Sequence, residues 1–129
     1  MDILDKIYKS LIADDYIKDQ ALGRIKYYEY PETGDVTKPF IVIDPINTPD
    51  PSDYGSNKWM KYDYLIQIDV WSLNRKITDA IADKVRDIMW DVFGFSQKPG
   101  PKEYDKDTGV FRDARRYRGA LYRDDLDSL

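Results

Sequence analysis

The sequence predicts an α+β fold, a single small domain in which two helices flank a mixed or antiparallel sheet of about four strands. Three observations support this. Apolar residues recur at helical spacing in two segments, other segments have the alternation or the continuous apolar run of strands, and no linker or repeat divides the 129 residues. The expected order is α-β-β-β-α-β, with an extra hairpin possible near the C-terminus. The domain should span residues 1–123, and residues 124–129 form an acidic tail.

Two amphipathic helices are expected. In the first, Asp2 is the expected N-cap, and the apolar stripe consists of Ile3, Leu4, Ile7, Tyr8, Leu11 and Ile12. In the second, Asn74 is the expected N-cap and Gly94 the left-handed stop. Its stripe consists of Ile77, Ile81, Val85, Ile88, Met89 and Val92. Both stripes should face the core.

The strands are expected from alternation and from apolar runs. The segment 23–31, "GRIKYYEYP", alternates and ends at a proline, whereas "KPFIVIDP" (38–45) is continuously apolar and suits a strand covered on both faces. The clearest strand is "WMKYDYLIQIDVWS" (59–72). Its core face should carry Tyr62, Tyr64, Ile66, Ile68 and Val70, and its water-facing side Lys61, Asp63, Gln67 and Asp69.

Residues 44–58, "DPINTPDPSDYGSNK", contain three prolines and a glycine, a density that disfavours both a helix and a central strand. The segment is expected to be a long loop. A plain hairpin connection and a docking loop fit it about equally well. Further along, "KEYD" (102–105) and "VFRDARRYRGALYR" (110–123) could form a hairpin that closes at "KDTG" (106–109).

The composition disfavours enzymatic chemistry. The chain has no cysteine and no histidine, which removes thiolate chemistry, the commonest general base and the usual zinc sites. The glycines are scattered and form no phosphate-binding loop. No apolar run is long enough to span a membrane, and the N-terminus is unlike a signal peptide. We therefore expect a protein made and kept in a cytoplasm, with no catalytic residue, no cofactor and no metal site.

Two metal-dependent alternatives also fail on pattern. "DKDTG" has the opening spacing of a calcium-binding loop, but the sixth and twelfth positions, which need glycine and glutamate, hold Val110 and Arg116. A turn is the better interpretation. The acidic-x-Lys arrangement of restriction-type nucleases is absent as well.

The C-terminal segment 110–123 carries five arginines, opposed within it only by Asp113. Strand periodicity places Phe111, Arg115, Tyr117, Leu121 and Arg123 on one face. It places Arg112, Ala114, Arg116, Arg118, Ala120 and Tyr122 on the other. Three interpretations are open for these arginines: contact with a protein partner, which we favour, a solvated surface, or contact with DNA.

The rest of the aromatic content also favours an interface. The chain has eleven tyrosines and three tryptophans, and tyrosine together with arginine is the mixture enriched in protein interfaces. Strand propensity alone explains about half of these aromatics. The residues expected to contact partners are Arg112, Arg116, Arg118, Tyr122, Tyr54 and Trp59.

The order of elements resembles a known family. A helix is followed by "KPFIVI", by "YDYLIQIDVWS" leading directly into "NRKITDAIADKVRDIM", and by "DTGVFRDARRYRGALY". This arrangement is similar to the small tail terminator (tail completion, head–tail joining) proteins of long-tailed phages with non-contractile tails. The resemblance spans about residues 1–123, and its specific parts are the strand-to-helix unit around "VWS" and the "RRYRG" strand.

The resemblance implies a structural virion protein at the tail–neck junction, present in the host cytoplasm during assembly. Its subunits would form a ring, usually a homo-hexamer, that caps the tail tube, ends polymerisation and offers a surface for head–tail joining. The implied partners are other copies of the chain, the tail tube protein and a head-completion or neck protein. DNA would pass through the ring without specific binding.

Two alternatives remain open at this stage. One is another neck-ring (head-completion) protein, which the sequence separates poorly from a tail terminator. The other is a small nucleic-acid-binding accessory protein that uses the arginine-rich strand. The net charge of −4 weighs against a general nucleic-acid coat, so any basic patch must be local.

Overall fold

The computed structural model describes residues 2–30, 37–47, 49–55 and 58–122, with the backbone alone described in 52–55 and 58–60. The described helices are α1 (Ile3–Ile12), α2 (Asp15–Ala21) and α3 (Arg75–Phe93). The described strands are β1 (Ile25–Tyr27), β2 (Phe40–Pro45), β3 (Asp50–Gly55), β4 (Lys58–Ser72), β5 (Ser96–Lys98), β6 (Lys102–Asp105) and β7 (Val110–Tyr122). The α+β class is confirmed. The sheet has seven described strands where about four were expected, and the unexpected helix α2 lies between α1 and the first strand.

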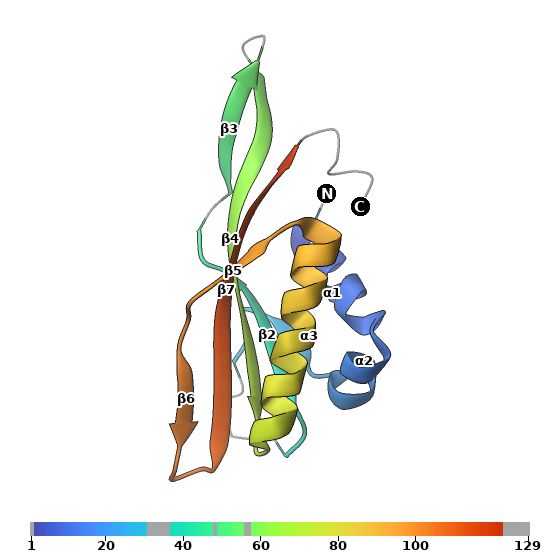
Figure 1. Ribbon diagram of the computed structural model, residues 1–129, viewed down its shortest axis with the longest axis vertical. Coiled ribbons are helices and arrows are strands. Elements are labelled where there is room, and N and C mark those ends of the chain that lie inside the picture. Colours follow the sequence, from blue (N-terminus) through green and yellow to red (C-terminus); the bar gives the residue numbers. More distant parts are fainter. Residues whose placement is uncertain (1, 31–36, 48, 56–57, 123–129) are drawn as a thin grey trace.

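The long strands β4 and β7 lie side by side at the centre of a mixed sheet of order β1-β2-β4-β7-β5 (Figure 1). Among the described strands, β1 and β2 form a parallel pair, and the other pairs are antiparallel. Two short strands extend this order: β3 pairs with the first part of β4, where β2 is no longer beside it, and β6 pairs with the first part of β7. The β3–β4 hairpin therefore projects beyond the helices as an arm (Figure 1).

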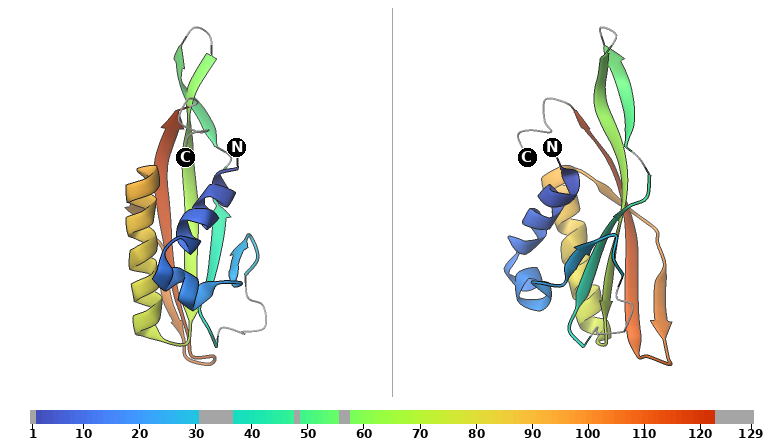
Figure 2. Two further views of the ribbon diagram at one scale, coloured as in Figure 1. Left: turned by 90° about the vertical axis from the view of Figure 1, so that its right-hand side faces the viewer. Right: turned by 180° about the vertical axis from the view of Figure 1, so that it is seen from behind.

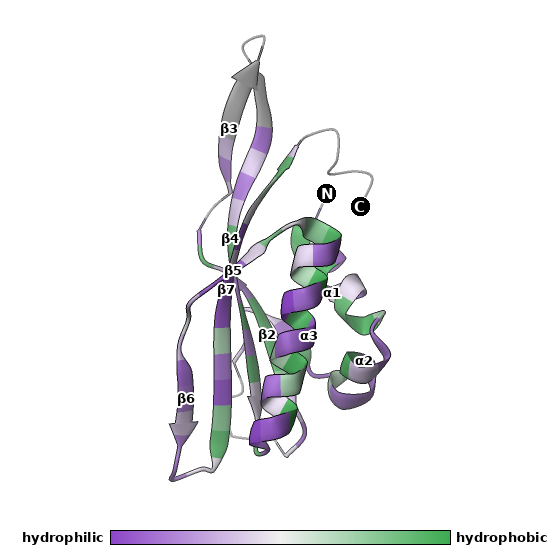
Figure 3. Ribbon diagram, viewed as in Figure 1, coloured by the Kyte–Doolittle hydropathy of each residue, from purple (hydrophilic) through white to green (hydrophobic). Residues whose placement is uncertain are grey.

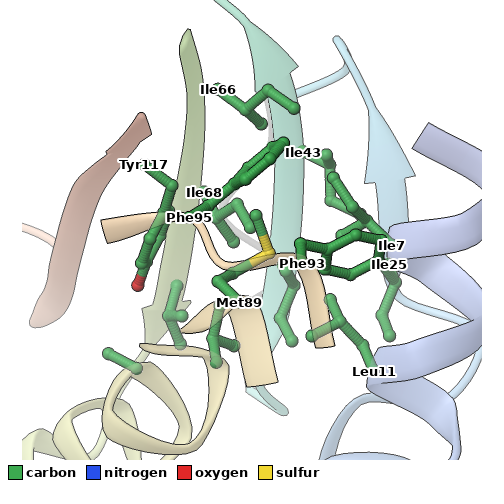
Figure 4. Close-up of a cluster of buried hydrophobic side chains, with 14 of the residues drawn as sticks. Ile7, Leu11, Ile25, Ile43, Ile66, Ile68, Met89, Phe93, Phe95 and Tyr117 are labelled. Atoms are coloured by element: carbon green, nitrogen blue, oxygen red, sulfur yellow. The ribbon is translucent and has the colours of Figure 1, made fainter. Parts of the chain in front are cut away.

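All three helices lie on one face of the sheet, which gives two layers (Figure 2). The core fills the space between the layers (Figure 4). Among its fully buried members are Ile7, Leu11, Ile17, Ile41, Ile43, Ile66, Ile81, Met89 and Phe95. The predicted core face of β4 is confirmed, because Tyr64, Ile66, Ile68 and Val70 belong to this cluster and Tyr62 packs against it. The predicted double coverage of β2 is confirmed too, since Ile41, Val42 and Ile43 are all completely buried.

Both predicted helix starts are confirmed by their caps. The Leu4 amide donates to Asp2 Oδ1 at 3.0 Å, and the Ile77 amide donates to Asn74 Oδ1 at 3.0 Å. Gly94 ends α3 with φ 71°, in the left-handed region. Hydrophilic residues form a band along the exposed side of α3 (Figure 3).

For one residue of the apolar stripe on α3, the predicted burial is wrong. Val92 is largely exposed, whereas Phe93, one position further along, is buried. The last turn of α3 thus places the residue next to the Gly94 stop against the core.

Two predicted segments differ from the observed strands. The expected strand 23–31 is reduced to the three residues of β1, because Tyr28 adopts φ 63° and breaks the extended conformation. The expected loop 44–58 contains the end of β2, all of β3 and the first residue of β4. Pro51 is compatible with β3 because no described strand lies beyond it, so an edge position tolerates the missing amide.

The predicted C-terminal hairpin is confirmed. Asp105 is opposite Val110, and the turn between them contains Gly109 at φ 76°. The Asp107 amide donates to Asp105 Oδ1 at 2.9 Å, so this aspartate stabilises the turn. None of the helices in the described part of the chain is long and apolar enough to cross a membrane.

Candidate interaction surface

The face of the sheet opposite the helices brings together most of the residues expected to contact partners. On β7, the side chains of alternate residues leave the sheet on opposite faces. Arg115 bonds to Asp83 of α3, and Tyr117 and Leu121 are in the core, so these residues lie on the helix side. Arg112, Arg116, Arg118 and Tyr122 therefore share one face, as the sequence predicted, and that face is the helix-free one.

A buried carboxylate organises the middle of this face. Asp69 of β4 is completely buried. Its Oδ2 accepts from Arg112 Nε at 2.9 Å and forms an ion pair with Arg112 Nη2 at 2.8 Å. Its Oδ1 accepts from Gln67 Nε2 at 2.9 Å. The sequence placed Asp69 and Gln67 on a water-facing side, which is wrong. Both are buried, and the cost of burial is offset by the hydrogen bond between them, by the bond from Arg112 to Asp69 and by the bond from Arg116 to Gln67.

Arg112 is held by its own chain on several sides. In addition to Asp69, it reaches Glu103 Oε1 at 3.5 Å, and its guanidinium lies 5.1 Å from the centre of the Trp71 ring. Burial lowers the pKa of Arg112, but the hydrogen bond and charge of Asp69 outweigh it and leave the pKa raised. Its cation is thus already neutralised within the chain.

The network continues toward β2 through Tyr30. The Tyr30 hydroxyl donates to Asp44 Oδ2 at 2.7 Å, and its ring meets the Trp71 ring edge-on at 6.1 Å. Burial raises the pKa of Tyr30, and the hydrogen bond to Asp44 raises it further. The phenol therefore stays protonated and serves as a donor across the end of the sheet.

Arg116 is exposed, and a buried side chain fixes its orientation. Its Nε donates to Gln67 Oε1 at 3.1 Å. The Gln67 amide has a fixed direction, because its nitrogen must face the acceptor Asp69, which leaves its oxygen for Arg116. With Nε engaged, the two terminal nitrogens of Arg116 remain for an external acceptor.

Arg118 is also exposed and, within the described part of the chain, forms no ion pair. It borders a hollow of about 410 Å³ at the base of the arm. The lining consists of Asn47, Asp50, Asp63, Tyr64, Leu65, Arg118, Gly119 and Ala120. Two of these carboxylates, Asp50 and Asp63, are directly opposite each other on β3 and β4.

The remaining predicted contact residues are at the arm end of the molecule. Tyr122 is partly exposed, and Lys61 lies 5.8 Å from the centre of its ring. Tyr54 and Trp59 are opposite each other across the β3–β4 ladder, and their side chains are outside the described part of the chain. The structure thus separates Tyr54 and Trp59, on the arm, from the arginines on the body of the sheet.

Arg115 has a role within the fold. On the helix side, its Nε and Nη2 bond both oxygens of the buried Asp113, at 2.9 and 3.0 Å, and its Nη1 reaches Asp83 Oδ1 at 2.9 Å. These contacts tie β7 to α3. Burial lowers the pKa of Arg115, but its bonds to Asp113 and Asp83 leave it raised.

Sequence reasoning placed Asp69 and Gln67 on this face but did not predict their burial, and it gave Tyr30 and Trp71 no role in the network. A weak signal was present, because Asp69 and Gln67 follow each other at strand spacing within an otherwise apolar segment. The described residues contain no group of three acidic, histidine or cysteine side chains placed to hold a metal ion.

Comparison with known proteins gives a similarity of fold. A chain in a solved structure described as the virion of a native gene transfer agent (GTA) particle superposes with a TM-score of 0.65 and 13% sequence identity. The match covers 90% of this chain and 91% of that chain. No protein-family model and no curated protein sequence matches. At this identity, the likeness concerns the whole fold rather than particular residues.

Proposed function

We propose that the chain is a structural virion protein and, more specifically, a tail terminator. Copies of it would form a ring, expected to be a hexamer, that caps the finished tail tube, ends polymerisation and presents the head–tail joining surface. The observation that carries the proposal is the near end-to-end match of fold to a chain of a GTA virion particle. The order of elements and the "RRYRG" strand favour the tail terminator within that class.

The proposed role needs interfaces rather than a catalytic centre, and the chain offers two. One is the helix-free face with Arg116 and Arg118. The other is the arm, whose sequence includes Tyr54 and Trp59. We propose that these surfaces contact neighbouring copies, the tail tube protein and a head-completion or neck protein. The protein would act without cofactor or enzymatic activity, in the virion and, during assembly, in the host cytoplasm.

The nucleic-acid alternative becomes weaker when the ion pairs are considered. Arg112 and Arg115 each bond carboxylates of their own chain, which leaves Arg116 and Arg118 as the described arginines of β7 without a carboxylate partner. Two cations displace few phosphate counterions, so binding to DNA would be weak and would fall off at moderate salt. A different neck-ring protein remains the nearer alternative.

Light-scattering mass measured over a concentration series tests the ring. A discrete closed oligomer near six subunits is expected, and a second measurement should show that it binds the ends of purified tail tubes. A protein that stays monomeric and does not bind tube ends contradicts the proposal. Salt-sensitive retention of duplex DNA by such a monomer would favour the accessory-protein alternative.

A further inference from the structure

We propose that Arg116 and Arg118 form a carboxylate-binding pair that docks onto Asp15 and Asp19 of a second copy of this chain. The inference rests on the proposed function, since it assigns the contact between neighbours in the ring. The first observation is that a hydrogen bond from its own chain orients the Arg116 side chain, unlike that of an isolated surface arginine.

Arg116 is oriented by a series of hydrogen bonds that runs through buried side chains. Asp69, completely buried, fixes the amide of Gln67, which is itself 6% exposed, and Gln67 Oε1 accepts from Arg116 Nε. Asp69 is in turn fixed by two bonds from Arg112. The Arg116 side chain therefore loses little further freedom when it binds, and its terminal nitrogens form a fork suited to a carboxylate.

Arg118 doubles the charge at the same place. It lies two residues further along β7 on the same face, about 6.6 Å away by the usual strand rise. Arg118 is exposed and forms no ion pair among the described residues. The two guanidiniums thus form a pair that is exposed to solvent.

A matching acidic pair lies on the opposite layer of the molecule. Asp15 and Asp19 are one turn apart on α2, about 6 Å along its axis. Both are exposed, and neither forms an ion pair within the described part of the chain. Ile17, between them in sequence, is completely buried, so the two carboxylates point away from the core. Like charges one turn apart repel each other, and a cationic partner would relieve that repulsion.

The two-layer fold suits a ring in which the helix-free face of one copy contacts the helical layer of the next. Repeated head-to-tail contacts join one face of each copy to a different face of the next copy. The helices cover one side of the sheet (Figure 2). The arginine pair is on the other side, because Tyr117 between them packs into the core. Stacking the helix-free face of one copy on the helical layer of its neighbour would bring opposite charges of similar spacing together.

A carboxylate fits this site better than a phosphate backbone does. Asp63, next to Arg118 in the hollow, is exposed, and Asp50 lies opposite it. These acids repel any anion, and the repulsion grows with the number of charges that approach, so a continuous polyanion is disfavoured more than two single carboxylates are.

A charge exchange tests the pairing directly. The variants are Arg116→Glu with Arg118→Glu, and Asp15→Lys with Asp19→Lys, each measured alone and then mixed in equal amounts by light-scattering mass. We expect each variant alone to need about tenfold more protein for half-assembly, because two pairs become repulsive at each contact. Neither variant can form this contact with copies of itself, because the two facing pairs then carry charges of the same sign. Recovery of oligomer in the mixture would therefore identify the two pairs as partners.

Two further variants keep the test decisive. Arg118→Glu alone leaves the Gln67–Arg116 bond intact and should still weaken assembly, while its melting temperature stays that of the wild type. Lys76→Glu with Lys106→Glu makes the same change in charge at exposed lysines elsewhere and should leave the mass unchanged.

The possible failures are distinguishable. Wild-type protein that never self-associates contradicts the ring and this contact with it. Wild-type oligomers that persist in the arginine variant, or variants that stay apart when mixed, overturn the inference but leave the ring standing. Loss of duplex DNA binding in the arginine variant, with the oligomer intact, would assign the pair to phosphate instead.

Discussion

Asp69 is the single residue on which the helix-free face depends most. It is a completely buried carboxylate that accepts from Arg112 and Gln67, and Gln67 in turn orients Arg116. Replacement by alanine would leave Arg112 partly buried without its main counter-charge and Gln67 Nε2 without its acceptor. Removing one partner of such a pair is far more costly than removing an exposed charge.

We therefore expect Asp69→Ala to lower the free energy of unfolding by about 3–5 kcal/mol. Urea denaturation followed by circular dichroism measures it. Asp63→Ala is the matched control, since Asp63 is on the same strand and face but exposed, and it should change stability by less than about 0.5 kcal/mol. Equal effects of the two substitutions would show that the Asp69 network contributes no more than a surface charge.

Residue-level prediction from the sequence succeeded where the signal is local. Asp2, Asn74 and Gly94 were identified correctly because caps and stops depend on their immediate neighbours. The burial of Asp69 and Gln67 was not predictable in this way. Alternation tells which face of a strand a side chain occupies, but it does not tell what covers that face. Asp69 is contacted by Arg112, which is 43 residues away in the sequence.

At the scale of elements, the packing of β7 against β5 depends on a missing side chain. A Cβ built at Gly119 of β7 would overlap the ring of Phe95, which is completely buried just before β5. Phe95 also stacks on Tyr64 of β4, with ring centres 5.8 Å apart, so it has little room to move. The glycine therefore allows three strands to share one aromatic contact.

Gly119→Ala is expected to destabilise the fold by about 1–3 kcal/mol through overpacking. Thermal and urea unfolding measure the change, and a double-mutant cycle with Phe95→Leu identifies its cause. In the leucine background, the cost of the added methyl group should shrink, because the ring that it meets is gone. An undiminished cost would point to the backbone at position 119 rather than to Phe95.

The elements that the sequence predicted well are those whose pattern is long. The stripe of α3 and the core face of β4 extend over many residues, and both were confirmed apart from Val92. Several short elements were missed, among them α2, which has seven residues, and β3, which contains a proline. β3 exists because β4 continues past the end of β2 and offers an unpaired edge, which is a property of the partner strand rather than of β3 itself.

At the scale of the whole molecule, the arm is the feature that the helical layer does not cover. The β3–β4 ladder projects beyond the helices (Figure 1), and β7 pairs with β4 no further than Lys61. Past that point the described arm has two strands, and a two-stranded hairpin alone is at best marginally stable in water. Its sequence nevertheless includes Tyr54 and Trp59, residues typical of binding hot spots. An arm built for contact would use these residues between molecules and contribute little to the stability of one chain.

This argument separates assembly from folding. We expect Tyr54→Ser with Trp59→Ser to leave the melting temperature within about 2–4 °C of the wild type, because the arm lies outside the core, while the oligomer or tube-bound fraction falls at least tenfold. Trp90→Ser is the matched control, since Trp90 is 61% exposed on α3 and tests the loss of a surface tryptophan away from the arm. Light-scattering mass and thermal unfolding on the same samples measure both quantities. If assembly survives in the arm variant, or fails equally in the control, the arm is not the contact surface.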